Sequence, residues 1–208
     1  MDKSIDKLTG LLVKSEFQDR LTHEVQRAKR YQRPLTLLVI EVDWTYFEKE
    51  INIRAIMPYT IFKQLGPIIT RQLRTVDFAG RMAGETFSAM LPETPLSGAF
   101  IAADRLRAAI ESHEFIGDDV EGRLRVAINV GVASFPEHGR DADELASTAN
   151  KALLMCRAEG GNKAIVYPQE LYKASEVFWF PPGAAPAPAD AGGAPTAEEV
   201  PPPAPQQD

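Results

Sequence analysis

The stretch Leu35–Asp43 places the strongest constraint on the fold, because it is a nearly continuous apolar run. A strand with one solvated face would alternate apolar and polar residues. An unbroken apolar run is instead typical of a central strand that is buried on both faces. The sequence therefore predicts a sheet with this strand at its centre and with helices covering it.

Helical and strand patterns alternate along the rest of the chain. Ser15 and Gln18 have the spacing of a capping box, and apolar residues at helical spacing predict a helix over 16–31 that ends before Pro34. The other predicted elements are a helix in the later part of 51–73, a hairpin over 77–91, a helix over 95–113 with Phe100, Ala103, Leu106 and Ile110 on its buried face, a strand over 124–135, a helix from Asp141 to Gly160–Gly161, and a strand over 163–167. This order predicts an α/β (α+β) fold with a central mixed sheet flanked by helices.

The predicted hairpin consists of strands over 77–82 and 85–91, with Ala83–Gly84 at its tip. Gly84 can adopt the positive φ that tight hairpins need. Glu85 follows the tip directly, so its carboxylate is held at a rigid turn, where a metal or a phosphate can bind. A surface hairpin with a solvated glutamate fits the same residues.

Two acidic residues, Glu41 and Asp43, interrupt the apolar run at its end. At positions i and i+2 of a strand they point to the same face of the sheet. Burying two carboxylates is costly unless they are solvated, paired or bound to a cation. The strand either reaches water here or ends at a cation site, and the pattern alone leaves both open.

Composition divides the chain into a body, residues 1–170, and a terminal segment, residues 171–208. The terminal segment begins with an aromatic cluster, Val177–Phe180, and continues as a Pro- and Ala-rich stretch without Lys or Arg. Such a stretch cannot bury enough surface to offset its ordering entropy, so we expect it to be disordered. We expect the aromatic cluster to pack back onto the body, although a partner protein is the alternative.

The charge and the single cysteine exclude several classes of protein. The tail carries four of the six net negative charges, which leaves the body near neutral and without the basic face that nucleic-acid binding needs. Cys156 cannot form an internal disulfide and lies on the predicted buried side of a helix, so we expect a packing role. No signal-peptide core and no apolar run long enough to span a membrane are present, which favours a cytoplasmic protein.

Five landmarks, taken in order, resemble the GGDEF family, the diguanylate cyclase domain. They are Asp6-Lys-Leu-Thr-Gly-Leu11, Glu41-Val-Asp43, Arg81-Met-Ala-Gly-Glu-Thr-Phe87, Leu91-Pro92 and Gly131-Val-Ala-Ser-Phe-Pro136. The resemblance runs from Asp6 to about Val166. It implies a ferredoxin-like palm, akin to class III nucleotidyl cyclases, and a link to cyclic di-GMP.

Active members of this family join two GTP molecules across a dimer, and each subunit holds one GTP with two Mg²⁺. The resemblance implies that metal would contact Glu41, the backbone carbonyl of Val42, and Glu85, because Mg²⁺ prefers oxygen ligands. The catalytic glutamate of the family signature is Thr86 here, which makes the signature degenerate. A neutral hydroxyl cannot replace that charge, so we expect two-metal assembly to fail.

The residues that the family uses for guanine and phosphate also differ. Asn52 lies too far along for a clean match to the asparagine that reads the base, and no acidic residue lies between Glu50 and Asp77 to supply its aspartate partner. Arg157 replaces a family lysine and can still contact a phosphate, whereas the family arginine soon after it is Gly161. These differences argue against efficient cyclase activity.

A second family site, the inhibitory product site Arg-x-x-Asp, is retained as Arg74 and Asp77, five residues before the signature. A further family arginine falls at Arg105. Arginine can bind guanine O6 and N7 or phosphate, and aspartate can accept from the guanine N–H edge. The alternative is an ordinary local ion pair between Arg74 and Asp77.

These observations favour a catalytically inactive GGDEF domain that senses cyclic di-GMP and signals through a protein partner or a homodimer. No cofactor is required for this role, and Mg²⁺ and weakly bound GTP belong to the vestigial active site. An active diguanylate cyclase with variant ligands and a pure protein-interaction module are the alternatives.

Overall fold

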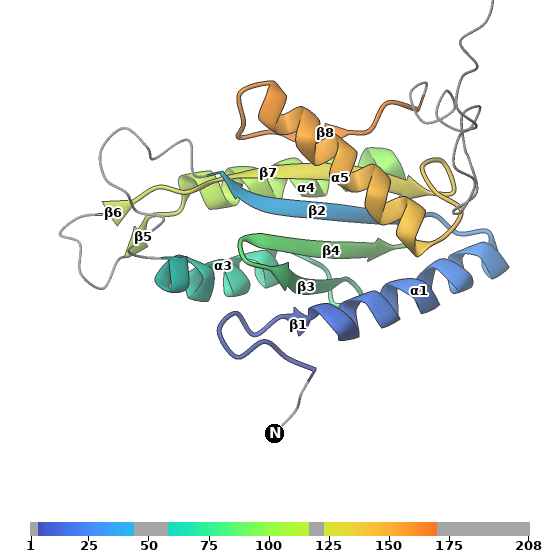
Figure 1. Cartoon of the computed structure of the whole chain (residues 1–208), viewed down its shortest axis with the longest axis horizontal. Coiled ribbons are helices and arrows are strands. Elements are labelled where there is room, and N and C mark those ends of the chain that lie inside the picture. Colours follow the sequence, from blue (N-terminus) through green and yellow to red (C-terminus); the bar gives the residue numbers. More distant parts are fainter. Residues whose placement is uncertain (1–3, 44–57, 117–122, 170–208) are drawn as a thin grey trace, which may run out of the picture.

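The computed structural model describes residues 4–43, 58–116 and 123–169, and its centre is a six-stranded sheet with the order β1-β3-β4-β2-β7-β8 (Figure 1). β1 and β8 pair in parallel with β3 and β7, whereas β2, β3, β4 and β7 pair in antiparallel fashion, which confirms a mixed sheet. The strands are β1 (Leu12–Val13), β2 (Leu35–Asp43), β3 (Phe78–Ala83), β4 (Thr86–Pro92), β7 (Ala127–Phe135) and β8 (Ala164–Val166).

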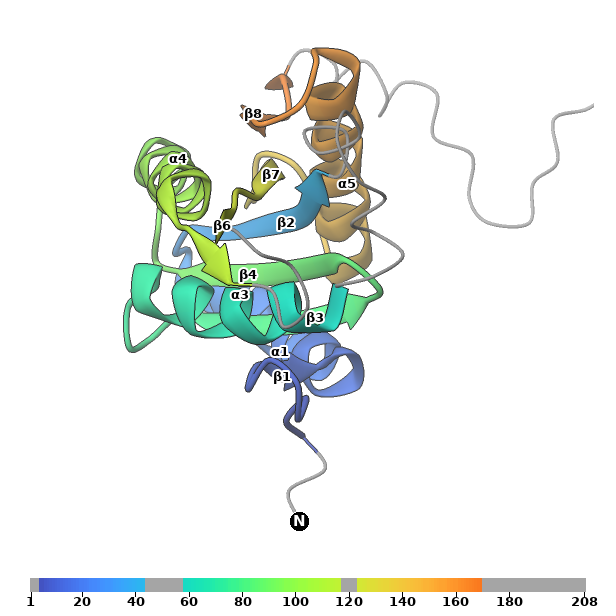
Figure 2. The same ribbon diagram turned by 90° about the vertical axis from the view of Figure 1, so that its left-hand side faces the viewer.

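Helices cover both faces of this sheet (Figure 2). One face is covered by α1 (Lys14–Tyr31) and α5 (Ala142–Ala158), and the other by α3 (Pro58–Gln72) and α4 (Leu96–Ser112). A separate two-stranded sheet pairs β5 (Phe115–Ile116) with β6 (Arg123–Leu124). Among the described helices, none combines the length and the hydropathy needed to cross a bilayer.

All residues of β2 are buried, as the apolar run predicts. Leu38, Ile40 and Val42 face the core beneath α3 and α4, whereas Leu35, Leu37 and Val39 face the core beneath α1 and α5. The strand alternation places Glu41 and Asp43 on the α1/α5 side. The end of β2 therefore carries its carboxylates under α5.

The hairpin of β3 and β4 forms as predicted, but its tip lies one residue further along. Ala83 pairs with Thr86, so the two-residue turn is Gly84–Glu85, and Gly84 has a φ of 52°. The register shifts between Arg81 and Ala83, which marks a β-bulge. The bulge adds Met82 to β3, so Ala83 pairs with Thr86 and only Gly84 and Glu85 form the turn.

Three local predictions are wrong. The N-cap of α1 is Val13 without a side-chain cap, because α1 begins directly after β1 and leaves Ser15 inside the first turn. On α4, Ala99 takes the buried position, whereas Phe100 lies one residue off the stripe and is 43% exposed. The predicted strand over 124–135 divides, because β6 pairs with β5 while β7 joins the main sheet.

The cap at the start of α5 is confirmed, since the Asp141 side chain accepts a hydrogen bond from the Glu144 N–H at 2.8 Å. Cys156 is buried with its thiol 3.5 Å from the Val130 carbonyl, as expected for a packing residue. Asn52 and the whole of 170–208 lie outside the described residues, so the predictions made for them stay predictions.

Gly131 of β7 lets α5 approach the sheet closely. A Cβ on Gly131 would lie 2.1 Å from the Ala149 carbonyl oxygen and 2.5 Å from the Leu153 nitrogen, both backbone atoms of α5. We expect Gly131→Ala to lower the free energy of unfolding by about 1–3 kcal/mol, as overpacking of a core does. Urea unfolding measures this change.

Gly98→Ala in helix α4 is the matched control, because it adds the same methyl group at a position with more room. The added Cβ would lie 3.5 Å from Thr94 Cγ2, an ordinary van der Waals contact. This substitution should leave the chain as stable or raise the stability by up to about 1 kcal/mol, the difference in helix propensity between Gly and Ala. Equal effects of the two substitutions would show that α5 does not pack on Gly131 at this distance.

Candidate functional site

The carboxylates at the end of β2 are buried, with Glu41 only 8% and Asp43 only 6% exposed. Glu41 is held by Arg157, which lies in the last turn of α5. Arg157 Nε donates to Glu41 Oε2 at 2.7 Å, and Arg157 Nη2 contacts Glu41 Oε1. The hydrogen bond to Glu41 is the main cause that raises the pKa of Arg157. A protein cation therefore already neutralises this carboxylate.

Asp43 is held by groups from β7 and from the turn after α5. Asp43 Oδ2 accepts from the Asn129 side chain at 3.4 Å and from the Asn162 N–H at 3.2 Å. The same oxygen would lie 1.9 Å from a Cβ at Gly161, whose φ is 76°. Gly161 is the position at which the resemblance implies an arginine. Asp43 already fills the space that a side chain at residue 161 would need, so no such side chain fits unless Asp43 moves.

Glu85 and Thr86 lie beside β2 at the same end of the sheet. Thr86 is the cross-strand partner of Glu41, and the Val42 N–H donates to the Glu85 carbonyl at 3.3 Å. Arg81 links the turn to the first landmark, since its guanidinium donates to the Gly84 carbonyl at 3.2 Å and lies 3.5 Å from the Asp6 carboxylate. Three of the five landmarks, those that contain Asp6, Glu41 and Glu85, therefore meet at one end of the sheet.

A pair of Mg²⁺ ions fits these residues poorly. Within the described ranges, no three Asp, Glu, His or Cys side chains are grouped closely enough to hold a metal ion. Both oxygens of Glu41 face Arg157, and the side chain opposite Glu41 is the neutral Thr86. Two divalent ions need several oxygen ligands with net negative charge, and this edge offers little that is not already neutralised.

A second cluster lies between the end of α3, the start of β3 and the exposed side of α4. Asp77 Oδ2 accepts from the backbone N–H of Arg74 at 2.7 Å, and Arg105 Nη2 donates to the Gln72 carbonyl at 2.6 Å. The structure thus brings Arg74, Asp77 and Arg105 together. In the part of the chain that the structure describes, the side chains of Arg74 and Asp77 do not form the local ion pair that the sequence leaves open.

One oxygen of this cluster has no partner. Asp77 Oδ1 is buried and has no hydrogen-bond partner among the described residues. Burial raises the pKa of the Asp77 carboxyl, and the Arg74 N–H and the charges of Arg74 and Arg105 offset that rise only in part. Arg74 and Arg105 are both exposed beside it. A buried acceptor between two exposed guanidinium groups is suited to a ligand with both N–H donors and negative charge.

Sequence reasoning missed two residues of the first site. Asn129 is 98% buried, donates to Asp43, and keeps a side-chain oxygen without a partner among the described residues. Asn162 donates to Asp43 through its backbone and to Glu111 through its side chain. A polar residue inside an otherwise apolar strand was the available signal for Asn129, whereas no pattern pointed to Asn162.

Comparison with known proteins places these motifs in a family. The family model described as "Diguanylate cyclase, GGDEF domain" matches residues 3–163. The chain belongs to the GGDEF domain family. The response regulator PleD of Caulobacter vibrioides is 27% identical over 168 residues, which make up 77% of this chain and 35% of PleD. The chain thus spans about a third of the length of this relative.

Two solved GGDEF domains confirm the fold of this one. The GGDEF domain of TpbB (YfiN) from Pseudomonas aeruginosa matches with a TM-score of 0.72 and 23% identity, covering 83% of this chain and 99% of that one. The GGDEF domain of DgcB from Caulobacter crescentus, solved in complex with c-di-GMP, matches with a TM-score of 0.71 and 18% identity, covering 80% of this chain and 97% of that one.

Proposed function

We propose that this GGDEF domain binds cyclic di-GMP at Arg74, Asp77 and Arg105, does not synthesise it, and passes the bound state to a partner protein or to a second copy of itself. The observation that carries this proposal is the buried Asp77 Oδ1, which lacks a partner among the described residues and lies between two exposed arginines. The DgcB GGDEF domain, which shares this fold, was solved with the same dinucleotide.

The chemistry of cyclic di-GMP suits this cluster. Each guanine offers N–H donors on one edge and the O6 and N7 acceptors on another, and arginine binds that second edge in a bidentate manner. Asp77 Oδ1 accepts from the donor edge, while Oδ2 stays with the Arg74 backbone. Arg74 and Arg105 then contact O6, N7 or the phosphates, where charge-assisted hydrogen bonds are strong.

The first site supports binding without synthesis. Arg157 already pairs with the carboxylate of Glu41, and Thr86, the cross-strand partner of Glu41, is uncharged. Asp43 fills the space that a side chain at Gly161 would need. If a nucleotide binds here, Glu41, the Val42 carbonyl and Glu85 are the groups that would contact its Mg²⁺, and Arg157 would contact a phosphate. Such binding requires Arg157 to leave Glu41 first, so we expect GTP to bind weakly.

Calorimetric titration of the full chain with cyclic di-GMP tests the proposal. We expect saturable binding of the dinucleotide and much weaker binding of GTP with Mg²⁺. Absence of binding would favour the pure interaction module, which predicts a stable complex in a pull-down but no ligand. Formation of cyclic di-GMP from GTP would favour the active cyclase.

Binding should depend on pH through Asp77. Only the ionised carboxylate accepts hydrogen bonds at both oxygens, so affinity is expected to fall as the pH falls through the raised pKa of Asp77. The fall should therefore begin at a higher pH than for an ordinary aspartate. The stability of the ligand-free protein depends on pH in the opposite direction to the binding affinity. The raised pKa of Asp77 contributes stability at low pH, and this contribution is lost as the pH rises through that pKa.

Asp77→Asn separates this effect from other titrations. The variant should bind cyclic di-GMP more weakly at neutral pH, and its affinity should stay flat over the acidic range in which the wild type declines. Calorimetry at a series of pH values measures both chains. Parallel decline in the wild type and the variant would assign the pH dependence to a different group.

A further inference from the structure

The sheet end opposite the Glu41 and Asp43 site carries an apolar groove between α1 and β7. Its volume is about 540 Å³, and its exposed lining is mostly apolar, with Ala28 and Pro34 on one side and Phe135 and Pro136 on the other. Lys29 and Arg33 also line it, and neither side chain forms an ion pair within the described ranges. A cavity of this size and composition is typical of a binding site for a few apolar groups. We call it the α1–β7 groove.

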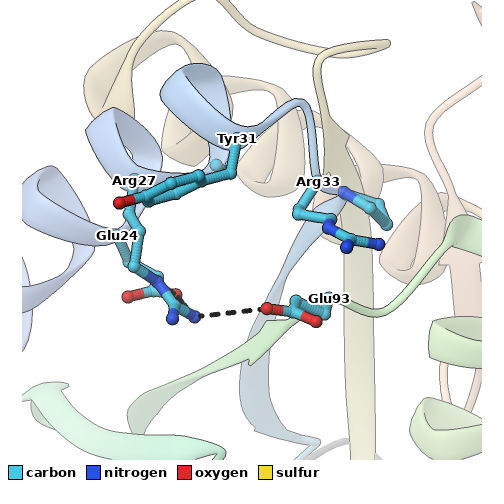
Figure 3. Close-up of a pocket in the computed structure, with 7 residues that line it drawn as sticks. Glu24, Arg27, Tyr31, Arg33 and Glu93 are labelled. Atoms are coloured by element: carbon cyan, nitrogen blue, oxygen red, sulfur yellow. Dashed lines mark hydrogen bonds and ion pairs between the residues drawn. The ribbon is translucent and has the colours of Figure 1, made fainter.

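A neighbouring cavity of about 470 Å³ lies on the other side of Arg33, between α1 and Glu93 (Figure 3). Three of its charged side chains contact one another, because Arg27 donates to Glu24 at 2.8 Å and lies 3.9 Å from Glu93. The α1–β7 groove differs from this cavity in its mostly apolar exposed lining, which suits an apolar occupant.

The chain leaves its last strand in the direction of this groove. β8 runs parallel to β7 with Val166 opposite Val132, so the residues after β8 continue toward the Phe135 end of β7. The Tyr167 N–H donates to the Val132 carbonyl at 3.0 Å, and the Tyr167 ring lies 6.4 Å from the ring of His138. His138 immediately precedes Gly139, which lines the groove.

We propose that the aromatic cluster Val177–Phe180 of this same chain binds in the α1–β7 groove. From Gln169 to Val177 the chain is eight residues long, and eight extended residues reach about 26–29 Å. Phe178, Trp179 and Phe180 supply apolar area that matches the lining of the groove. Docking within one chain gains the high effective concentration of a short tether.

Charge complementarity supports the same occupant. Glu176 directly precedes the aromatic cluster, and no Lys or Arg follows Lys173. The acidic segments on both sides of the aromatic cluster, which include Glu176 and Asp190, therefore complement the positive charges of Lys29 and Arg33 at a rim that also carries Glu137. This inference does not depend on cyclic di-GMP binding, because the groove is lined by α1, the end of β7 and the loop after it, whereas Arg74 and Asp77 lie between α3 and β3 and Arg105 lies on α4.

The fluorescence emission of Trp179 reports how far its indole ring is shielded from water. The chain has two tryptophans, so Trp44→Phe leaves Trp179 as the only one in the full chain. We expect its emission to shift to longer wavelength in Lys29→Glu/Arg33→Glu, which reverses the charge of the groove rim. Lys14→Glu/Lys63→Glu, a charge reversal at two exposed lysines elsewhere, should leave the emission unchanged. If the folded Trp44→Phe chain, without any groove substitution, already emits at the wavelength of the urea-unfolded chain, the proposal is wrong.

Hydrogen exchange locates the contact independently. In Phe178→Ser/Trp179→Ser/Phe180→Ser, the amides of 29–33 and 137–140 should exchange about tenfold faster than in the wild type. The control Pro201→Ser/Pro202→Ser/Pro203→Ser should leave them unchanged. Unchanged exchange in both variants, or faster exchange only elsewhere, would overturn the groove as the site.

Dilution distinguishes docking within one chain from docking between two copies. If dilution dissociates a dimer and at the same time removes the shielding of Trp179, a second copy of the chain is the occupant and the intramolecular proposal is wrong.

Discussion

Replacing Arg74 with alanine is expected to weaken the binding of cyclic di-GMP by about a hundredfold, because loss of a charged partner in such a contact costs roughly 3 kcal/mol. The guanidinium of Arg74 is exposed and makes no hydrogen bond within the described residues, so it is available to the ligand. The contact with Asp77 runs through the Arg74 backbone N–H, which alanine retains. The stability of the variant should therefore stay within about 0.5 kcal/mol of the wild type.

Arg71→Ala is the matched control for this prediction. Arg71 lies in the last turn of α3, is exposed, and carries the same charge three residues earlier. Calorimetry should show little change for this variant. Equal losses in both variants would mean that general positive charge attracts the ligand. Wild-type affinity in Arg74→Ala would show that the ligand binds elsewhere or that Arg74 does not contact it.

The full chain is expected to form cyclic di-GMP from GTP at a rate at least about a thousandfold below that of an active GGDEF domain, since removal of one charge-stabilising group alone typically costs a hundred- to a thousandfold. Two differences act together here. Thr86 supplies no carboxylate opposite Glu41, and Arg157 already pairs with Glu41. Incubation with GTP and Mg²⁺ or Mn²⁺, followed by chromatography, measures the product.

Thr86→Glu alone should not restore synthesis. The new carboxylate would face Glu41 across the β2–β4 pair, where like charges repel, and Arg157 and Gly161 would remain as they are. Glu85→Ala is the control for residual activity. A steady yield of cyclic di-GMP that Glu85→Ala abolishes would show that the signature of this chain is catalytically competent.

The sheet and its helices were predictable because the patterns that encode them are local. The apolar run of Leu35–Asp43 and the helical spacing over 16–31 each need only a short window of sequence, and the structure has both elements. The hairpin was predictable for the same reason, yet its tip moved because a bulge near Met82 is not visible in the pattern of apolar residues.

The candidate sites were only partly predictable because their key contacts join distant residues. Glu41 and Arg157 are 116 positions apart, and Asp43 and Asn162 are 119 positions apart. No periodicity reports such pairs, so sequence reasoning left Glu41 and Asp43 open between solvent and a cation. The spacing of Arg74 and Asp77 marked the second cluster, but it did not reveal that the contact uses a backbone N–H and leaves Asp77 Oδ1 without a partner among the described residues.

A crystal structure of the full chain grown with cyclic di-GMP, GTP and Mg²⁺ together tests the central claim most directly. The account expects the dinucleotide against Arg74, Asp77 and Arg105, with a guanine N–H donating to Asp77 Oδ1 and with Arg157 still paired to Glu41. GTP and two metal ions ordered against Glu41 and Glu85, with no dinucleotide at Arg74, would contradict it.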